Sequence, residues 1–317
     1  MSLVVGHACC GSYEMGLYGG VPRFDHQLKR TFPNRALLVE PWQIKAFCEA
    51  FPNAVVFADN HYAIHVKRNV RCIVVHHGCA AEHYARTQDP SLAQLAEAQG
   101  QIWSVRSPSN TLVVSCSTFC VDTFLEHYGS AYAVFPGAIV LHACEHDNDI
   151  VWKPLHTNNG TIHVLGNFST AQKRGFVDLM SLQCADIKVH DLRINIAPDE
   201  TTEDFQRRKQ LEYMKNDVFV QLSICEGYSY ATLDALSMGM PVVSTPVGLC
   251  YKDLPENAFV KIECGITIEE IRTAIRCAHA AQDELSKYAR AFCQANTRFM
   301  YWQAKMKTLA DQVRTWN

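Results

Sequence analysis

The chain has 317 residues, of which 48% are hydrophobic and 19% charged, and its formal net charge is −3 at pH 7. This balance excludes a disordered chain, and because neither half carries an excess of Lys and Arg, it also excludes a strongly basic nucleic-acid-binding domain. No apolar run reaches the roughly 18 residues that a membrane-spanning helix needs. The opening residues 1–6 lack the basic start and long apolar core of a signal peptide. The 14 cysteines stand mostly singly in apolar segments, with no paired Cys-x-x-Cys, so we expect a cytoplasmic protein with reduced thiols.

Short apolar runs alternate with helical stretches along the chain. The first set of expected strands comprises Val4–Val5, Ala36–Val39, Ala54–Phe57, Cys72–Val75, Thr111–Val114 and Ala131–Phe135. After a turn-rich, polar stretch at 136–160, a second set comprises Thr161–Leu165, Ile187–Val189, Val218–Leu222 and Pro241–Thr245. Fully apolar strands separated by helices predict parallel sheets covered on both faces. We therefore expect an α/β protein with two Rossmann-like domains, 1–140 and 150–298.

Two elements of the first domain could contact a ligand. Gly19 and Gly20 come just before Pro22 and a predicted helix, and they allow positive φ and close backbone approach; a plain tight turn is the alternative. His77 follows the expected strand Cys72–Val75 and precedes a glycine. Because open α/β sheets bind ligands beyond the carboxyl ends of their strands, we expect His77 to face a ligand, although it could merely cap loop carbonyls.

Two polar clusters near residue 145 have the composition of metal sites, but we expect no metal there. Asp147 and Asp149 form an Asp-x-Asp in the predicted interdomain connection, away from the end of a sheet strand. His142, Cys144 and His146 would share one face of an extended chain. Such crowding is expected by chance in a chain rich in cysteine and histidine.

The most informative segment is 217–248. A strand at Val218–Leu222 leads through a loop into a helix at Tyr230–Met238, and seven residues separate Glu226 in the loop from Asp234 in the helix. The N–H groups of a helix N-terminus bind anions, whereas carboxylates beside them are suited to hydroxyls. Phosphate together with hydroxyls predicts a nucleotide sugar; a generic βαβ unit with two chance acids is the alternative.

This segment resembles the donor-site signature of the family 4 retaining glycosyltransferases. That signature is an acid, seven residues, a second acid, and then Gly-x-Pro before a Val-Val strand. Glu226, Asp234 and the run Gly239-Met-Pro241 match it, with Asp234 standing where the family usually has Glu. The resemblance implies a GT-B fold, in which two Rossmann-like domains face each other across a cleft. The second domain is expected to be shortened, because only about 60 residues separate Gly166 from Glu226.

The resemblance also implies a role for each motif. Glu226 and His77 are the expected catalytic residues, and Asp234 is expected to accept hydrogen bonds from the ribose. Lys173 and Arg174 would neutralise the diphosphate, with solvated surface charge as the alternative, and Asn167 stands where the family has an arginine. The remaining donor-binding residues are expected to be Gly19, Gly20, Gly227, Tyr228, Ser229 and Tyr230.

The predicted function is transfer of a sugar from a UDP- or GDP-sugar to a hydroxyl of a glycan, lipid or protein, with retention of configuration. No metal or other cofactor is expected, because side chains and a helix dipole would stabilise the leaving phosphate. One alternative is an epimerase or phosphorylase of the same architecture. Another is a catalytically impaired sugar-nucleotide-binding protein, which Asn167 and Asp234 favour.

The last stretch of the chain has the apolar pattern of an amphipathic helix. Apolar residues recur at spacings of three and four at Phe299, Trp302, Met306, Leu309 and Val313. In the resembling fold the last helix returns to the first domain, so we assign residues from about 300 to 317 to that domain. A helix packed wholly on the second domain is the alternative.

Overall fold

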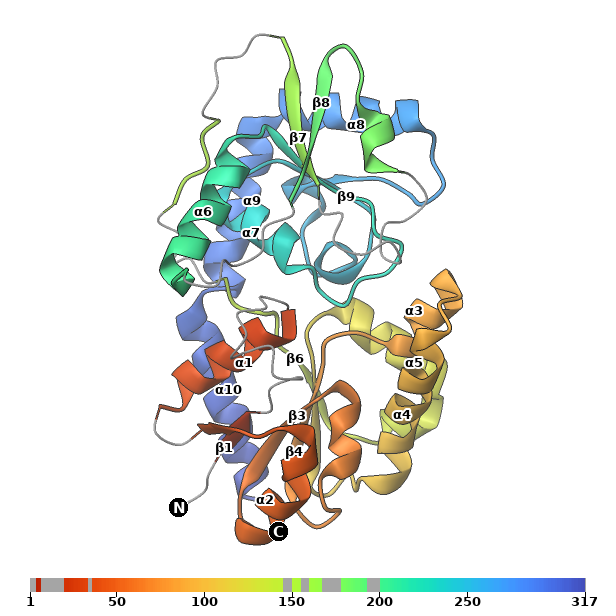
Figure 1. Ribbon diagram of the computed structural model, residues 1–317, viewed down its shortest axis with the longest axis vertical. Coiled ribbons are helices and arrows are strands. Elements are labelled where there is room, and N and C mark those ends of the chain that lie inside the picture. The colour runs from red at the N-terminus through yellow and green to blue at the C-terminus, as the bar shows by residue number, and fades with distance from the viewer. Residues whose placement is uncertain are drawn as a thin grey trace. The chain divides into compact units, whose positions relative to one another are not determined.

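The structure is a computed structural model. It describes residues 4–6, 20–33, 36–144, 150–154, 160–166, 178–192 and 200–316. The chain forms two compact units, of which unit 1 comprises Met1–Ala143 and Phe299–Asn317, and unit 2 comprises Cys144–Arg298. Each unit contains its own parallel sheet flanked by helices (Figure 1), so the predicted α/β architecture is confirmed.

Unit 1 is built on a six-stranded parallel sheet with the order β2-β1-β3-β4-β5-β6. Its strands are β1 (Val4–Gly6), β2 (Ala36–Leu38), β3 (Val55–Asp59), β4 (Arg71–His76), β5 (Thr111–Ser115) and β6 (Gly137–Ile139). Its helices are α1 (Gly20–Thr31), α2 (Ile44–Ala50), α3 (Ala80–Thr87), α4 (Ser91–Val105), α5 (Thr118–Ala133) and α10 (Phe299–Arg314), with short 3-10 turns at Pro41–Gln43 and Asn60–His65.

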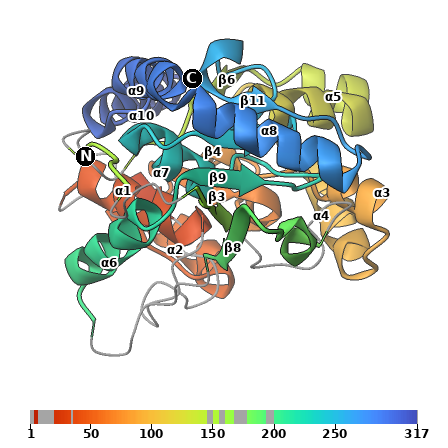
Figure 2. The same ribbon diagram turned by 90° about the horizontal axis from the view of Figure 1, so that it is seen from above.

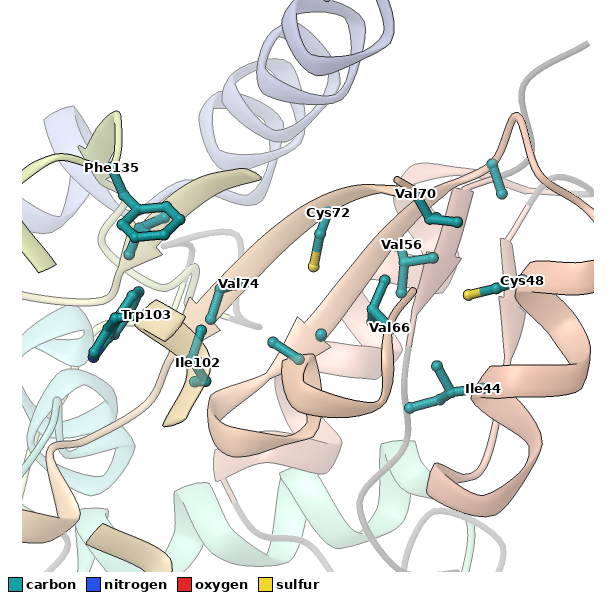
Figure 3. Close-up of a cluster of buried hydrophobic side chains, with 14 of the residues drawn as sticks. Ile44, Cys48, Val56, Val66, Val70, Cys72, Val74, Ile102, Trp103 and Phe135 are labelled. Carbon is teal, nitrogen blue, oxygen red and sulfur yellow. The ribbon is translucent and has the colours of Figure 1, made fainter. Parts of the chain in front are cut away.

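The central strands of unit 1 bury both faces, as their continuous apolar character predicts. Val56, Cys72 and Val74 point to one face, where Ile44 of α2 and Ile102 of α4 pack against them (Figure 3). The alternate strand residues Val55, Phe57, Ile73 and Val75 point to the other face. Two hydrophobic cores, one on each side of the sheet, therefore stabilise unit 1.

The second of these cores includes helix α10. Trp302 is 1% exposed, and its ring meets the ring of Phe24 on α1 edge-on at 5.5 Å between centroids. The guanidinium group of Arg30 lies over the ring of Phe299, 4.3 Å from its centroid. Figure 1 shows α10 beside α1. The sheet of unit 1 is thus covered on one face by helices from the two ends of the described chain.

One expected strand of unit 1 is wrong. Residues 131–133 form the last turn of α5, and the strand that follows starts only at Gly137. Tyr132 and Phe135 both reach the core from positions three residues apart, which is helical spacing. A five-residue apolar run is short enough to fit either structure, and here the contacts of these two rings favour the helix.

Unit 2 is built on a five-stranded parallel sheet with the order β11-β10-β9-β7-β8. Its strands are β7 (Ile162–Gly166), β8 (Ile187–Asp191), β9 (Val218–Gln221), β10 (Val242–Ser244) and β11 (Val260–Lys261). Its helices are α6 (Thr202–Met214), α7 (Tyr230–Met238), α8 (Ile268–Ala280) and α9 (Gln282–Asn296), with 3-10 turns at Leu179–Leu182, Gly248–Cys250 and Glu256–Ala258.

Helices α8 and α7 pack against this second sheet. Ile271 and Ile275 of α8 pack against Val220 and Val243 of the sheet, and Figure 2 shows α8 running alongside β9. Helix α7 contacts β9, β10 and α9. None of the helices in the described part of the chain is long and apolar enough to cross a membrane.

Candidate functional site

The order of the strands in unit 2 identifies where a ligand would bind. The chain passes from β7 to its neighbour β8, and then returns to the other side of β7 to form β9. Ligands of open α/β sheets bind beyond the carboxyl ends of the strands at such a reversal. The loop that leaves β9 at this point contains Glu226 and leads into α7, which contains Asp234.

The Glu226 side chain is held by polar residues of the same loop and strand. Glu226 is 8% exposed, and its Oε1 accepts hydrogen bonds from Gln221 Nε2 and Ser223 Oγ, each at 3.4 Å. The backbone of Ser223 is held in turn, because Thr245 Oγ1 donates a hydrogen bond of 2.6 Å to its carbonyl oxygen. These contacts from β9 and the end of β10 hold a carboxylate beyond the carboxyl ends of the strands.

The backbone of the same loop is held by a close contact with Gly248. The N–H of Leu249 donates to the carbonyl oxygen of Tyr228 at 3.1 Å. Gly248 has φ +54°, and a Cβ atom at this position would lie 2.9 Å from that same carbonyl oxygen. Tyr228 itself is 3% exposed. The loop therefore requires a glycine at position 248, both for its φ and for the space.

Helix α7 begins directly after this loop. Its N-cap is Ser229, which has φ 69° and whose Oγ accepts the N–H of Thr232 at 3.4 Å. The first backbone bond within the helix is donated by Leu233 to the carbonyl oxygen of Ser229, at 3.1 Å. The N–H groups of Tyr230 and Ala231 therefore belong to the first turn, at the positive end of the helix dipole, where anions bind.

Asp234 lies one turn further along α7 and is 1% exposed. Its Oδ2 forms an ion pair with the Nζ of Lys209 on α6, whose side chain is 15% exposed. Tyr213 of α6 also donates a hydrogen bond of 2.9 Å from its hydroxyl group to the carbonyl oxygen of Ala231. Helix α6 is thus joined to the first turns of α7 by two polar contacts, and Lys209 is a residue that the sequence did not single out.

Several predicted residues lie outside the described part of the chain. These are Gly19, Asn167, Lys173 and Arg174, together with the acids Asp147 and Asp149 and the cluster residue His146. Gly20 is described, and it is the exposed first residue of α1 in unit 1. Within the described residues, no group of three or more His, Cys, Asp or Glu side chains could hold a metal ion. The structure therefore brings together the predicted residues from 226 to 234, all within one loop and the start of one helix.

Unit 1 contains a second polar cluster, around His77. Its Nε2 lies 2.7 Å from Oδ1 of Asp59, and its backbone N–H donates to Oδ1 of Asn60 at 2.9 Å. The side chains of His77 and Asp59 are only 9% and 3% exposed. The carboxyl group of Asp25 of α1, which is fully buried, lies close to that of Asp59. Neither aspartate stood out in the sequence.

Burial dominates the protonation of this cluster. It raises the pKa of Asp25 well above the ordinary range, and the nearby carboxylate of Asp59 raises it further. Burial also lowers the pKa of His142 well below its usual value, with smaller effects of His77 and Arg23 in the same direction. The neighbouring His76 is fully buried, and its pKa falls to about 3. Burial therefore favours the neutral forms of Asp25, His142 and the neighbouring His76.

Comparison of the structure with solved protein structures identifies the type of fold. No protein-family model matches the chain, and no curated protein matches it by sequence. Sucrose-phosphate synthase from Thermosynechococcus elongatus aligns with a TM-score of 0.74 and 12% identity over 99% of both chains. HepE of Anabaena, solved with UDP and glucose, aligns with a TM-score of 0.69 and 12% identity over 98% of this chain and 100% of that one.

The chain has the GT-B fold. A glycosyltransferase from Rickettsia africae also covers nearly the whole chain, with a TM-score of 0.59 and 11% identity over 99% of this chain and 98% of that one. Because the sequence identities are so low, these likenesses concern the fold. The GT-B type predicted from the motif at 217–248 is thereby confirmed.

Proposed function

We propose that this protein transfers a sugar from a nucleotide diphosphate sugar to a hydroxyl acceptor, with retention of configuration. The observation that carries the proposal is the nearly buried carboxylate of Glu226, held by Gln221 and Ser223 beside the N-terminus of α7. This carboxylate lies at the strand reversal of a GT-B fold. HepE, which shares that fold, has been solved with UDP-glucose, so UDP-glucose is the first donor to test.

The first turn of α7 supplies a site for the diphosphate. The N–H groups of Tyr230 and Ala231 lie before the first backbone bond of the helix, and the helix dipole favours negative charge there. The cations Lys173 and Arg174 are proposed to complete the diphosphate site. Asn167 stands where the family has an arginine, so Lys173 and Arg174 are proposed to serve together the roles of the family's two cations. Together these groups would stabilise the departing phosphate without a metal ion.

The two acids would act on different parts of the donor. Glu226 would accept hydrogen bonds from the sugar hydroxyls, and its negative charge would stabilise the positive charge that develops as the bond to phosphate breaks. Asp234 would accept the ribose hydroxyls. In the structure its carboxylate is already paired with Lys209, so the ribose would bind to this ion pair rather than to an isolated carboxylate.

Unit 1 would bind the acceptor, with His77 as the contact to its hydroxyl group, and we place the reaction in the cytoplasm. An epimerase would convert the donor into a different sugar nucleotide without an acceptor. A catalytically impaired binding protein would bind the nucleotide and release nothing. Both alternatives are therefore separated from a transferase by product analysis of the same reaction.

The test uses the intact protein with UDP-glucose, other UDP-sugars and GDP-sugars, in the presence and absence of hydroxyl acceptors. Release of nucleoside diphosphate is measured by chromatography, and the anomeric configuration of the product by proton NMR. Glu226→Gln should lower turnover by about 100-fold or more, because its charge matters most in the transition state, while UDP affinity measured by calorimetry changes little.

Glu212→Gln is the matched control, because Glu212 is a partly exposed glutamate of the same unit whose carboxylate forms an ion pair with the exposed Lys215. It should leave turnover unchanged. Equal activity of the Glu226→Gln variant and the wild type would refute the role of Glu226. A product with inverted configuration would refute retention.

A further inference from the structure

Unit 1 contains a chain of buried acid and histidine side chains that the proposed donor chemistry does not use. Asp25, Asp59 and His77 come from three different elements: α1, the end of β3, and the residue that follows β4. They meet beyond the carboxyl ends of neighbouring parallel strands, since Asp59 is paired in register with Val75. This is the edge of the sheet where ligands of α/β units bind.

The His77 ring is fixed on several sides. Nε2 lies 2.7 Å from Asp59 Oδ1, and the backbone N–H is held by Asn60, a residue with the uncommon φ of 45°. The ring of Phe24 meets the His77 ring edge-on at 5.0 Å between centroids, and the ring of His142 stacks on it at 5.4 Å. A histidine that only filled space would not need both its side chain and its backbone held by two consecutive residues, the last residue of β3 and the first of the turn that follows.

The hydrogen bonds determine which nitrogen of His77 carries the proton. Burial and the adjacent carboxylate of Asp59 raise the pKa of Asp25, so Asp25 is the acid of this pair that keeps its proton more readily. Asp59 is then the carboxylate of the pair, which accepts, and a hydrogen bond across the 2.7 Å contact needs a proton on His77 Nε2. In the neutral ring the other nitrogen, Nδ1, consequently has a lone pair. Among the described residues the structure gives Nδ1 no hydrogen-bond donor.

We infer that Asp59 is a positioning residue that holds His77 in the tautomer whose Nδ1 accepts a hydrogen bond from the acceptor's hydroxyl group. The inference rests on the proposed glycosyl transfer for the identity of the hydroxyl, but the tautomer of His77 is a property of the protein alone. The two can therefore be tested separately.

The test compares two isosteric substitutions of neighbouring buried aspartates. Asp59→Asn replaces an acceptor by an amide that can donate to Nε2, so His77 should shift its proton to Nδ1 and lose the acceptor. Asp25→Asn changes the neighbouring buried carboxyl group and leaves the carboxylate of Asp59 beside Nε2 in place, so little should change. Long-range ¹H–¹⁵N NMR of protein labelled with ¹⁵N-histidine reads the tautomer, and His77→Gln identifies the His77 signals.

We expect the neutral ring of His77 to carry its proton on Nε2 in the wild type and in Asp25→Asn, and on Nδ1 in Asp59→Asn. In the transfer assay, kcat should fall at least about 10-fold for Asp59→Asn, because the tautomer is wrong, while KM for the nucleotide sugar stays within about twofold. Asp25→Asn should keep kcat within about twofold.

Either of two results overturns the inference: an Nδ1–H tautomer in the wild type, or equal loss of kcat in both variants. If Asp59→Asn does not fold, the wild-type spectrum alone still decides whether Nδ1 has a lone pair. A wild-type protein with the expected tautomer and no transferase activity would refute the proposed function and leave the hydrogen-bonded geometry intact.

Discussion

Replacing Gly248 by alanine should loosen the loop that carries Glu226, and the structure allows the cost to be worked out. Gly248 has φ +54°, where a side chain costs about 1–2 kcal/mol. The new Cβ would lie 2.9 Å from the oxygen, 3.0 Å from the carbonyl carbon and 3.1 Å from the Cα of Tyr228, all of them backbone atoms. Overpacking of this kind costs about 1–3 kcal/mol. Alanine also reduces the conformational freedom of the unfolded chain, which stabilises the folded protein by about 0.4–1 kcal/mol. The net loss of stability should be about 2–4 kcal/mol.

Gly265 provides the matched control in the same unit. It has φ +88°, and a Cβ atom there would meet nothing within 4 Å. Gly265→Ala therefore has only the cost of the positive φ, which the reduced freedom of the unfolded chain partly offsets. It should lower the free energy of unfolding by about 1 kcal/mol or less. The difference between the two variants measures the contact with Tyr228.

The assay is urea unfolding of the intact protein followed by circular dichroism, together with calorimetry of UDP binding. Gly248→Ala should lose stability and about tenfold or more in UDP affinity, because the shifted Tyr228 backbone moves the first turn of α7. Gly265→Ala should bind UDP normally. Equal losses of stability in the two variants would show that the contact with Tyr228 contributes nothing. Unchanged UDP affinity in Gly248→Ala would show that this loop is not part of the donor site.

Three further outcomes are expected. His76 has a pKa of about 3 in the folded protein, below its value in the unfolded chain. Above about pH 6.5 the residue is neutral in both states and costs no stability, whereas stability is lost as the pH falls from there towards 3. This loss amounts to about 1.4 kcal/mol at pH 5.5, and urea unfolding at pH 8 and 5.5 should show a correspondingly smaller difference for His76→Phe; an unchanged difference would mean that His76 is not buried in its neutral form. Lys209→Met should cost about 3 kcal/mol because it leaves the carboxylate of Asp234 buried without its cation, and adding Asp234→Asn should restore part of that loss; additive losses in the double variant would argue against the ion pair. Nucleoside diphosphate release from UDP-glucose should persist in EDTA. Complete loss of activity that Mg²⁺ or Mn²⁺ restores would show that a metal ion binds the diphosphate.

The fold could be predicted because its strands are buried on both faces. Runs such as Cys72–Val75 and Val218–Leu222 have no polar alternation, which is the pattern of a parallel sheet between helices. The run Ala131–Phe135 has the same composition but belongs mostly to a helix. Composition alone could not separate the two, since the choice depends on which core the rings of Tyr132 and Phe135 reach.

The site could be predicted only where it is local in sequence. Glu226 and Asp234 belong to one loop and the helix that follows it, so their spacing is visible without the fold. Asp59 and His77 meet through the pairing of β3 with β4, and the residues next to either one in the sequence do not predict the contact. Lys209 follows Arg207 and Arg208 on a strongly charged helix, where the sequence does not mark which cation faces Asp234.

The discontinuity of unit 1 has a consequence for how the protein is made. A ribosome completes all the strands of unit 1 first, then the whole of unit 2, and only afterwards helix α10. Until that helix emerges, the sheet face that includes Val55, Phe57 and Ile73 lacks Trp302 and Met306 as cover. The nascent chain must therefore carry a partly open apolar face throughout the synthesis of unit 2, and such a surface favours aggregation and chaperone binding. The unit that is synthesised first is thus the last to be completed.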